Sequence, residues 1–218
     1  MLKSYKTLFA PAEETILIKK SRFIGYATPV ASEEEALAFI QSIQKKHWDA
    51  THNCYAYVFG QHDEVQKSND DGEPAGTAGK PILEVIKKEG LKNVAVVVTR
   101  YFGGIMLGAG GLIRAYSQGT TTALHAARIV TRELFQEIAV AIDYSWLGKV
   151  ENEIHGVDDY YIDRIEYLDR VTVHALVPVD EAERFRKQLI NATNGQAEIA
   201  NGEQRYYFVE DGKLISTR

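Results

Sequence analysis

The chain has 218 residues, of which 45% are hydrophobic and 25% charged, and its formal net charge is −5. This composition is that of an ordinary globular protein and excludes the disordered, fibrous and membrane-spanning classes. The length exceeds the ~100–150 residues most typical of one domain, so it predicts two compact units. Cys54 is the only cysteine, which excludes an intrachain disulfide, fits a reducing compartment and indicates a cytoplasmic protein.

Charge and glycine are distributed unevenly along the chain. Residues 1–130 carry a net charge of +2, whereas residues 131–218 carry a net charge of −7. Ten of the 17 glycines lie between Gly72 and Gly119. We therefore predict two domains, residues 1–130 and residues 131–218, with the specialised region in the first. The overall negative charge argues against a protein that coats nucleic acid, but the first domain alone is near neutral.

Apolar periodicity predicts the elements of the first domain. Strands are expected at 5–20, 22–30, 53–59 and 93–102, and helices from Ser32, from Pro81 to Gly90 and from Leu112 to Ala127. Ser32 and Glu35 form a capping box that begins the first helix. Residues 60–80 are polar and glycine-rich, so we expect a long loop there. The strand at 93–102 is almost continuously apolar, which predicts burial on both faces of a sheet.

The second domain alternates between strands and helices. Strands are expected at 134–142, 160–168, 171–177 and 205–209, with one helix capped by Asp143 and another capped by Asp180 and Glu183. The order βαββαβ is the ferredoxin-like pattern. The predicted fold class is therefore α+β. A ferredoxin-like fold hosts many functions and names none.

The common enzyme motifs are not matched. A Walker loop ending at Gly79-Lys80 would need glycine at position 74 and serine or threonine at position 81, and both positions are proline. A dinucleotide fingerprint starting at Gly108 would need glycine or alanine at position 113, which is isoleucine. His52 and Cys54 share one face of a strand, but two ligands are too few for a closed metal site. We expect no metal and no cofactor, and the sequence favours a non-enzymatic protein.

The stretch TRYFGGIMLGAGGLIRAYS (99–117) leads from a buried strand through a glycine-rich loop into a helix. Free amides and the positive helix end, expected at Leu112 to Arg114, can hold an anion, and arginines can add bidentate phosphate contacts. Alternatively, the glycines serve turns and close packing, and the arginines are solvated. The candidate ligands of phosphate or nucleic acid are Lys80, Arg100, Gly103, Gly104, Gly108, Gly110, Gly111 and Arg114.

The loop SNDDGEPAGTAGKP (68–81) is the second candidate site. Its acidic residues could bind a metal or act as acid and base, and Thr77 and Lys80 could hold phosphate near a helix start. Alternatively, the acidic residues only initiate turns. No positioned histidine or nucleophile accompanies the loop, so no catalytic residue is assigned. The candidates here are Asp70, Asp71, Glu73 and Thr77.

These two loops, together with SRFIGYATPV (21–30), strongly resemble the IMPACT family in its bacterial, YigZ-like form, over essentially the whole chain. The resemblance implies an N-terminal βαβ domain, with a left-handed crossover, like those of a ribosomal small-subunit protein and of domain four of elongation factor G. The C-terminal domain is expected to resemble domain five of that factor. Eukaryotic members are translational regulators that act through an extra N-terminal domain, which we expect this chain to lack. No catalytic residues are established for the family.

Three hypotheses about function follow. The favoured one is a non-enzymatic, translation-linked regulator that binds RNA or ribosomes through the basic, glycine-rich face of the first domain. A nucleotide- or phosphate-ligand-binding enzyme is the alternative, because LGAGGL weakly resembles the glycine loop of small-molecule kinases. The third is a protein-interaction adaptor whose acidic second domain recruits a partner. No association with a membrane is expected.

Overall fold

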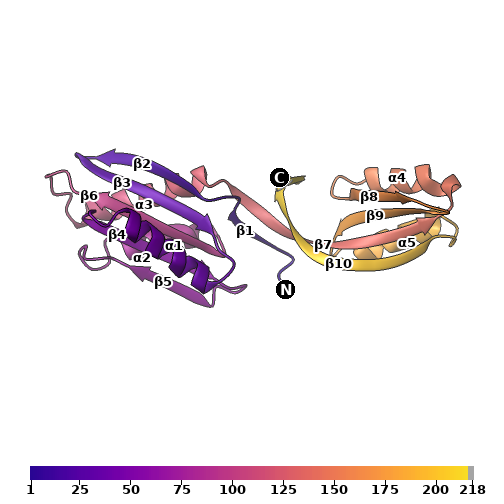
Figure 1. Ribbon diagram of the computed structural model, residues 1–218, viewed down its shortest axis with the longest axis horizontal. Helices are drawn as coiled ribbons and strands as arrows, with labels where there is room; N and C mark the ends of the chain where they lie inside the picture. Colours follow the sequence, from indigo (N-terminus) through magenta and orange to yellow (C-terminus); the bar gives the residue numbers. More distant parts are fainter. Residues whose placement is uncertain (216–218) are drawn as a thin grey trace. The chain divides into compact units, whose positions relative to one another are not determined.

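The computed structural model describes residues 1–215 and divides into two compact units (Figure 1). The N-terminal domain is Tyr5–Val130, and the C-terminal domain contains the residues from Thr131 onward together with Met1–Ser4. The first four residues belong with the C-terminal domain because the carbonyl of Lys3 accepts a hydrogen bond from the amide of Leu134, at 2.8 Å. The boundary at Thr131 lies inside one strand, β7 (Ile129–Ile142), and not in a glycine- or proline-rich linker.

The N-terminal domain is built on one antiparallel sheet. The strands of this sheet are β2 (Ala12–Ile18), β3 (Ser21–Pro29), β4 (His52–Phe59), β5 (Val65–Asn69) and β6 (Val94–Tyr101), in the order β2-β3-β6-β4-β5. β1 (Ser4–Leu8) is not part of this sheet. β3 and β4 are both antiparallel to β6, so they are parallel to each other and are joined by a βαβ crossover. The expected single strand at 5–20 is in fact two strands, separated around Pro11.

Helices cover both faces of this sheet. α1 (Glu33–Lys46) packs on one face, and α2 (Gly79–Lys88) with α3 (Ala109–Ala126) packs on the other (Figure 1). β6 is buried from Val94 to Arg100, which confirms the prediction of a strand covered on both faces. The predicted cap of α1 is also confirmed, since the amide of Glu35 donates to Ser32 Oγ at 3.2 Å.

Two expectations about the chain around 60–81 were wrong. The expected loop contains the edge strand β5, which pairs with β4. α2 begins at Gly79, two residues before Pro81. β5 escapes detection because four of its five side chains are exposed and polar, so the sequence VQKSN has no apolar alternation.

Close packing of α3 on the sheet depends on two glycines that face each other. A Cβ atom at Gly25 of β3 would collide with the carbonyl oxygen of Gly119 and would lie 2.8 Å from Cβ of Ala123. Gly119 of α3 is fully packed as well, since a Cβ there would lie 3.2 Å from Val98 Cγ1. This contact between backbones fixes the axis of α3 and therefore the position of its N-terminus.

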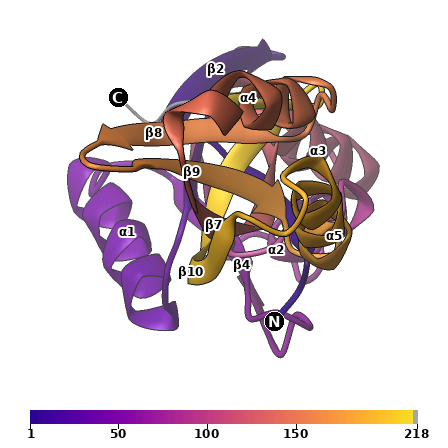
Figure 2. The same ribbon diagram turned by 90° about the vertical axis from the view of Figure 1, so that its right-hand side faces the viewer.

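The C-terminal domain is ferredoxin-like, as predicted. Its elements are β7, a short 3-10 helix η1 (Tyr144–Trp146), α4 (Leu147–His155), β8 (Tyr161–Tyr167), β9 (Val171–Pro178), α5 (Ala182–Ala192), β10 (Glu198–Glu210) and β11 (Lys213–Ile215). The order β10-β7-β9-β8, with all neighbours antiparallel, follows from the βαββαβ sequence of elements. α4 and α5 pack together on one face (Figure 2). No helix among residues 1–215 is both long and apolar enough to cross a membrane.

The predicted helix caps of the C-terminal domain were wrong. Asp143 precedes η1 but makes no side-chain capping hydrogen bond. Glu181, and not Asp180, is the N-cap residue of α5, and it also caps without a side-chain hydrogen bond. The helices form because their apolar faces are buried: Val150 and Ile154 of α4, and Phe185 and Leu189 of α5, are 0% exposed.

We predict opposite effects for alanine at two glycines. Gly25→Ala should destabilise the protein by about 1–3 kcal/mol, because the methyl group overpacks the contact between β3 and α3. Gly148→Ala should stabilise it by up to about 1 kcal/mol, because Gly148 lies in α4 with open space around it. Urea unfolding followed by circular dichroism measures both. Equal stability of Gly25→Ala and the wild type would show that α3 can move away from the sheet without cost.

Candidate functional site

Two helices of the N-terminal domain begin at the same edge of its sheet. β5 and β6 each run antiparallel to β4, so they are parallel and end at one edge. α2 follows β5 and α3 follows β6, which brings both helix N-termini, with their positive dipole ends, to this edge. His52, the first residue of β4, lies there too. The edge therefore brings together the two loops that the sequence singled out.

Asp70 neutralises the N-terminus of α2. Its Oδ1 accepts hydrogen bonds from the amides of Ala78 and Gly79, at 3.0 and 2.8 Å, and its Oδ2 accepts one from Gly76 at 2.8 Å. Partial burial acts to raise the pKa of Asp70, but the three amide donors outweigh it and hold the pKa below its usual range. The carboxylate is thus a helix cap and a loop anchor, which leaves it unavailable to a metal.

Asp71 and Thr77 also stabilise the loop. Asp71 Oδ2 accepts a hydrogen bond from the amide of Asn53 at 2.6 Å, which ties the loop to β4. Thr77 Oγ1 donates to the carbonyl of Pro74 at 2.6 Å and is therefore not directed at a ligand. Within residues 1–215, no three His, Cys, Asp or Glu side chains are grouped so that they could hold a metal ion.

Glu73 lies at the centre of a buried polar cluster. Its Oε1 accepts hydrogen bonds from Arg100 Nη1 at 2.6 Å and from the hydroxyl of Tyr116 at 2.7 Å. The side chains of Glu73 and Arg100 are 3% and 7% exposed. His52 Nε2 lies 3.8 Å from Glu73 Oε2, and the other ring nitrogen of His52 pairs with the carbonyl of Asp71. Burial, with the neighbouring Cys54 and Glu73, raises the pKa of Tyr116 far above its usual range, so its hydroxyl remains a donor.

The burial of Arg100 differs from what the sequence led us to expect. The free arginine expected at this position is instead paired with Glu73, and it also lies over the ring of Phe102, with Cζ 5.3 Å from the ring centroid. The other two predicted cations, Lys80 and Arg114, are exposed. They lie in the first turn of α2 and the second turn of α3, at the same edge of the sheet. Lys80 and Arg114 are therefore the predicted cations that remain open to a ligand.

Among residues 1–215, no side chain accepts a hydrogen bond from the first turn of α3, whose N-cap residue is Gly108. α3 begins at Ala109, so Gly110 and Gly111 lie in its first turn, and the amide of Leu112 already donates to the carbonyl of Gly108 at 2.9 Å. The expected anion position at Leu112 to Arg114 was therefore wrong by one turn. The first turn contains no acidic residue and receives no side-chain capping hydrogen bond. Amides at such a helix end are donors without partners inside the helix.

Three further glycines shape the loop before α3. Gly104 and Gly108 have φ of +83° and +70°, a left-handed conformation that favours glycine. Gly103 is needed because a Cβ atom there would collide with the backbone of Lys20 and lie 2.5 Å from the amide nitrogen of Ser21. The alternative that the glycines serve turns and close packing therefore holds for these three.

A cleft of about 410 Å³ opens beside the start of α3. This volume is within the ~300–1,000 Å³ range of small-ligand pockets. Phe102 and Met106, on the loop, are 47% and 84% exposed. The cleft is lined by Thr51, His52, Glu73, Pro74, Arg100, Phe102, Met106, Leu107, Gly108, Ala109 and Leu112. The cleft is therefore lined by apolar side chains, by the charged pair Glu73 and Arg100, and by the N-terminus of α3.

Three residues that line this cleft, His52, Phe102 and Met106, were not among the predicted site residues, and neither was Tyr116, which binds Glu73 beside it. His52 was named only as a neighbour of Cys54 on one face of a strand. Phe102 and Met106 gave a signal that could have been used: they are large apolar residues inside a glycine-rich loop, where burial is uncommon. The approach of Tyr116 to Glu73, 43 residues away in sequence, left no local signal.

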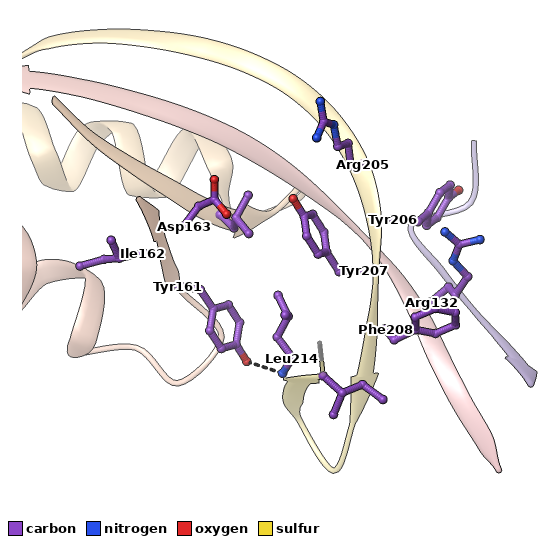
Figure 3. Close-up of a pocket in the computed structure, with 11 residues that line it drawn as sticks. Arg132, Tyr161, Ile162, Asp163, Arg205, Tyr206, Tyr207, Phe208 and Leu214 are labelled. Atoms are coloured by element: carbon purple, nitrogen blue, oxygen red, sulfur yellow. Dashed lines mark hydrogen bonds between the residues drawn. The ribbon is translucent and has the colours of Figure 1, made fainter. Parts of the chain in front are cut away.

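The C-terminal domain contains a second, larger hollow of about 710 Å³ on its sheet (Figure 3). Tyr161 and Tyr207 point into it from β8 and β10. The hydroxyl of Tyr161 accepts from the amide of Leu214 at 3.2 Å, Asp163 pairs with Arg164 at 2.9 Å, and Arg205 pairs with Glu203 at 2.6 Å. These groups already have partners, whereas Arg132 Nε, which also lines the hollow, has none among residues 1–215. Because the residues that line this hollow all lie on strands, without a helix N-terminus, we assign the candidate site to the cleft of the N-terminal domain.

The fold and the cleft define a class of two-domain α+β proteins, with a glycine-loop cleft in the first domain and a ferredoxin-like second domain. The family model described as "Impact N-terminal domain" matches residues 19–124, and the model described as "Domain of unknown function (DUF1949)" matches residues 140–196. The chain belongs to the IMPACT family.

Bacterial relatives match nearly the whole chain. IMPACT family member YvyE of Bacillus subtilis (strain 168) is 48% identical over 206 residues, 94% of each chain. IMPACT family member YigZ of Escherichia coli (strain K12) is 34% identical over 200 residues, covering 91% of this chain and 98% of YigZ. A crystal structure of a hypothetical protein, 33% identical, matches with a TM-score of 0.59 over 93% of this chain and 99% of its own.

Eukaryotic relatives match less than half of this chain. The protein IMPACT homolog of Dictyostelium discoideum is 38% identical over 99 residues, which cover 44% of this chain and 28% of that protein. Membership of this family fits a non-enzymatic regulatory role.

We predict that two arginines of the site contribute very differently to stability. Arg100→Ala should destabilise the protein by about 3–5 kcal/mol, because it leaves the carboxylate of Glu73 buried without its counter-charge. Arg114→Ala, at an exposed position, should change stability by no more than about 0.5 kcal/mol. Urea unfolding measures both. Combining Glu73→Gln with Arg100→Met should recover part of the loss, and an Arg100→Ala variant as stable as Arg114→Ala would contradict the buried ion pair.

Proposed function

We propose that this protein is a non-enzymatic, cytoplasmic regulator that is linked to translation. Its N-terminal domain would bind RNA, either free or in ribosomes. The binding face consists of the first turn of α3 with the exposed cations Lys80 and Arg114. The observation that carries the proposal is the uncapped N-terminus of α3 beside an open cleft. The resemblance of the chain to a family with translational regulators supports the same assignment.

The two helix ends at this edge differ in a way that favours an external anion. Asp70 lies against the N-terminus of α2, whereas no carboxylate among residues 1–215 binds the amides at the N-terminus of α3. A phosphate group would supply the missing negative charge, and the amides of a helix N-terminus suit it well. Lys80 and Arg114 flank this position and would each neutralise part of a second phosphate.

The charge of the two domains supports a division of roles. The C-terminal domain, with a net charge of −7 over residues 131–218, would repel a phosphate backbone. We assign it to a protein partner, in line with the adaptor hypothesis, and assign RNA to the near-neutral N-terminal domain. Binding of the two partners can then be lost separately.

The affinity for RNA should fall as the salt concentration rises, with a slope set by the number of exposed cations that contact phosphates. Fluorescence anisotropy with a labelled RNA and co-sedimentation with ribosomes, both across a salt series, measure this. Lys80→Ala and Arg114→Ala should each reduce the slope of log Kd against log salt by about 0.7–0.9, one phosphate contact apiece. These variants test the proposal better than Arg100→Ala, whose main effect is on folding.

Lys88→Ala is the matched control. Lys88 is exposed at the opposite end of α2, so its removal should leave the slope unchanged. Absence of salt-sensitive binding, or equal effects of all three lysine and arginine variants, would argue against RNA binding at this edge.

A second candidate function is the binding of a free nucleotide, and the observation that favours it is His52 beside Glu73 at the floor of the cleft. Such a ligand at 100 times its Kd would stabilise the protein by about 2.7 kcal/mol. Thermal melting with ATP and Mg²⁺, and with a panel of other nucleotides, tests this. A raised melting temperature with one nucleotide would favour this candidate, and an unchanged melting temperature across the panel would exclude it.

A further inference from the structure

The apolar wall of the cleft is exposed in a way that predicts a flat, apolar ligand surface. Phe102 and Met106 are 47% and 84% exposed, and Leu107 and Leu112 continue the wall toward α3. Large apolar side chains that gather around one cleft on a protein surface mark a binding site more often than isolated ones do. The ligand therefore presents an apolar face as well as a charge.

Phe102 already makes a cation–π contact. The guanidinium of Arg100 lies over two rings, with its Cζ 5.4 Å from the centroid of Phe23 and 5.3 Å from that of Phe102. About half of the Phe102 side chain is still exposed, so a planar group can cover it. Nucleobases stack on aromatic rings without regard to sequence, and cation–π contacts from arginine add to such stacks.

The charged end of the ligand would lie at the start of α3. Gly108 and Ala109 line the cleft, and the first turn of α3 has no cap. The charge of Arg100 is paired with that of Glu73, but its guanidinium offers a further donor at the same cleft. Its side chain is only 7% exposed and lines the cleft, and its Nε has no hydrogen-bond partner in the part of the chain that the structure describes.

We infer that the cleft binds one unpaired nucleotide of an RNA chain, with its base on Phe102 and Met106 and its phosphate at the N-terminus of α3. This inference rests on the proposed RNA binding and specifies the kind of RNA. A base inside an A-form duplex is stacked and paired, so it cannot reach Phe102. The protein therefore selects single-stranded segments, loops or bulges.

The test compares single-stranded and double-stranded RNA on the full chain. Anisotropy is measured with a labelled single-stranded oligonucleotide and with a blunt duplex of the same length at one salt concentration. Phe102→Ala should weaken binding of the single strand about 5- to 100-fold, the range of one lost base stack, and leave binding of the duplex unchanged. Phe102→Tyr should keep the affinity, whereas Phe102→Leu should lose most of it.

Trp48→Ala is the matched control, because Trp48 is 83% exposed and follows α1, which covers the opposite face of the sheet. It should bind both RNAs as the wild type does, and circular dichroism should show all variants folded. Equal binding of single strand and duplex, or equal losses for Phe102→Ala and Trp48→Ala, would overturn the inference and leave RNA binding standing. Absence of binding to either RNA would overturn both.

Discussion

The ion pair between Glu73 and Arg100 is the interaction on which the rest of the site depends. It joins the loop before α2 to the end of β6. The hydroxyl of Tyr116, on α3, donates to the same carboxylate. Removing two charges from water is costly, and only complete hydrogen bonding offsets that cost. Two donors on one carboxylate oxygen supply part of this compensation, and they hold three segments that are distant in sequence in one arrangement. The cleft is the space left beside them.

The carboxylates at this edge of the sheet bind groups of the protein itself. Asp70 caps α2, Asp71 holds β4, and Glu73 neutralises Arg100, so each acidic residue of the loop has an internal role. Three negative charges that the sequence suggested for a metal or for catalysis instead make the scaffold rigid. The start of α3 and the two exposed cations, Lys80 and Arg114, have no such internal role among the described residues. A loop with acidic residues thereby supports a site for an anion.

Much of the fold was predictable from sequence, and less of the site. The apolar run of β6, the cap at Ser32 and the βαββαβ order of the second domain are local patterns, and all three were confirmed. β5 was missed because an exposed edge strand has no apolar face. The start of α3 was placed too late, since a glycine run gives no helical signal. The burial of Arg100 depends on Glu73, 27 residues away, and no local pattern reports such a pairing.

Cys54 gives the scaffold a built-in reporter. Its side chain is fully buried in β4, and its thiol donates to the carbonyl of Asp70, at 2.9 Å, beneath the loop that caps α2. Burial raises the pKa of this thiol far above its usual range, which suppresses the thiolate that alkylating reagents need. Because the chain has no other thiol, the rate of its modification measures how often this loop lifts from the sheet. The unmodified protein thus carries a probe of local opening next to the site itself.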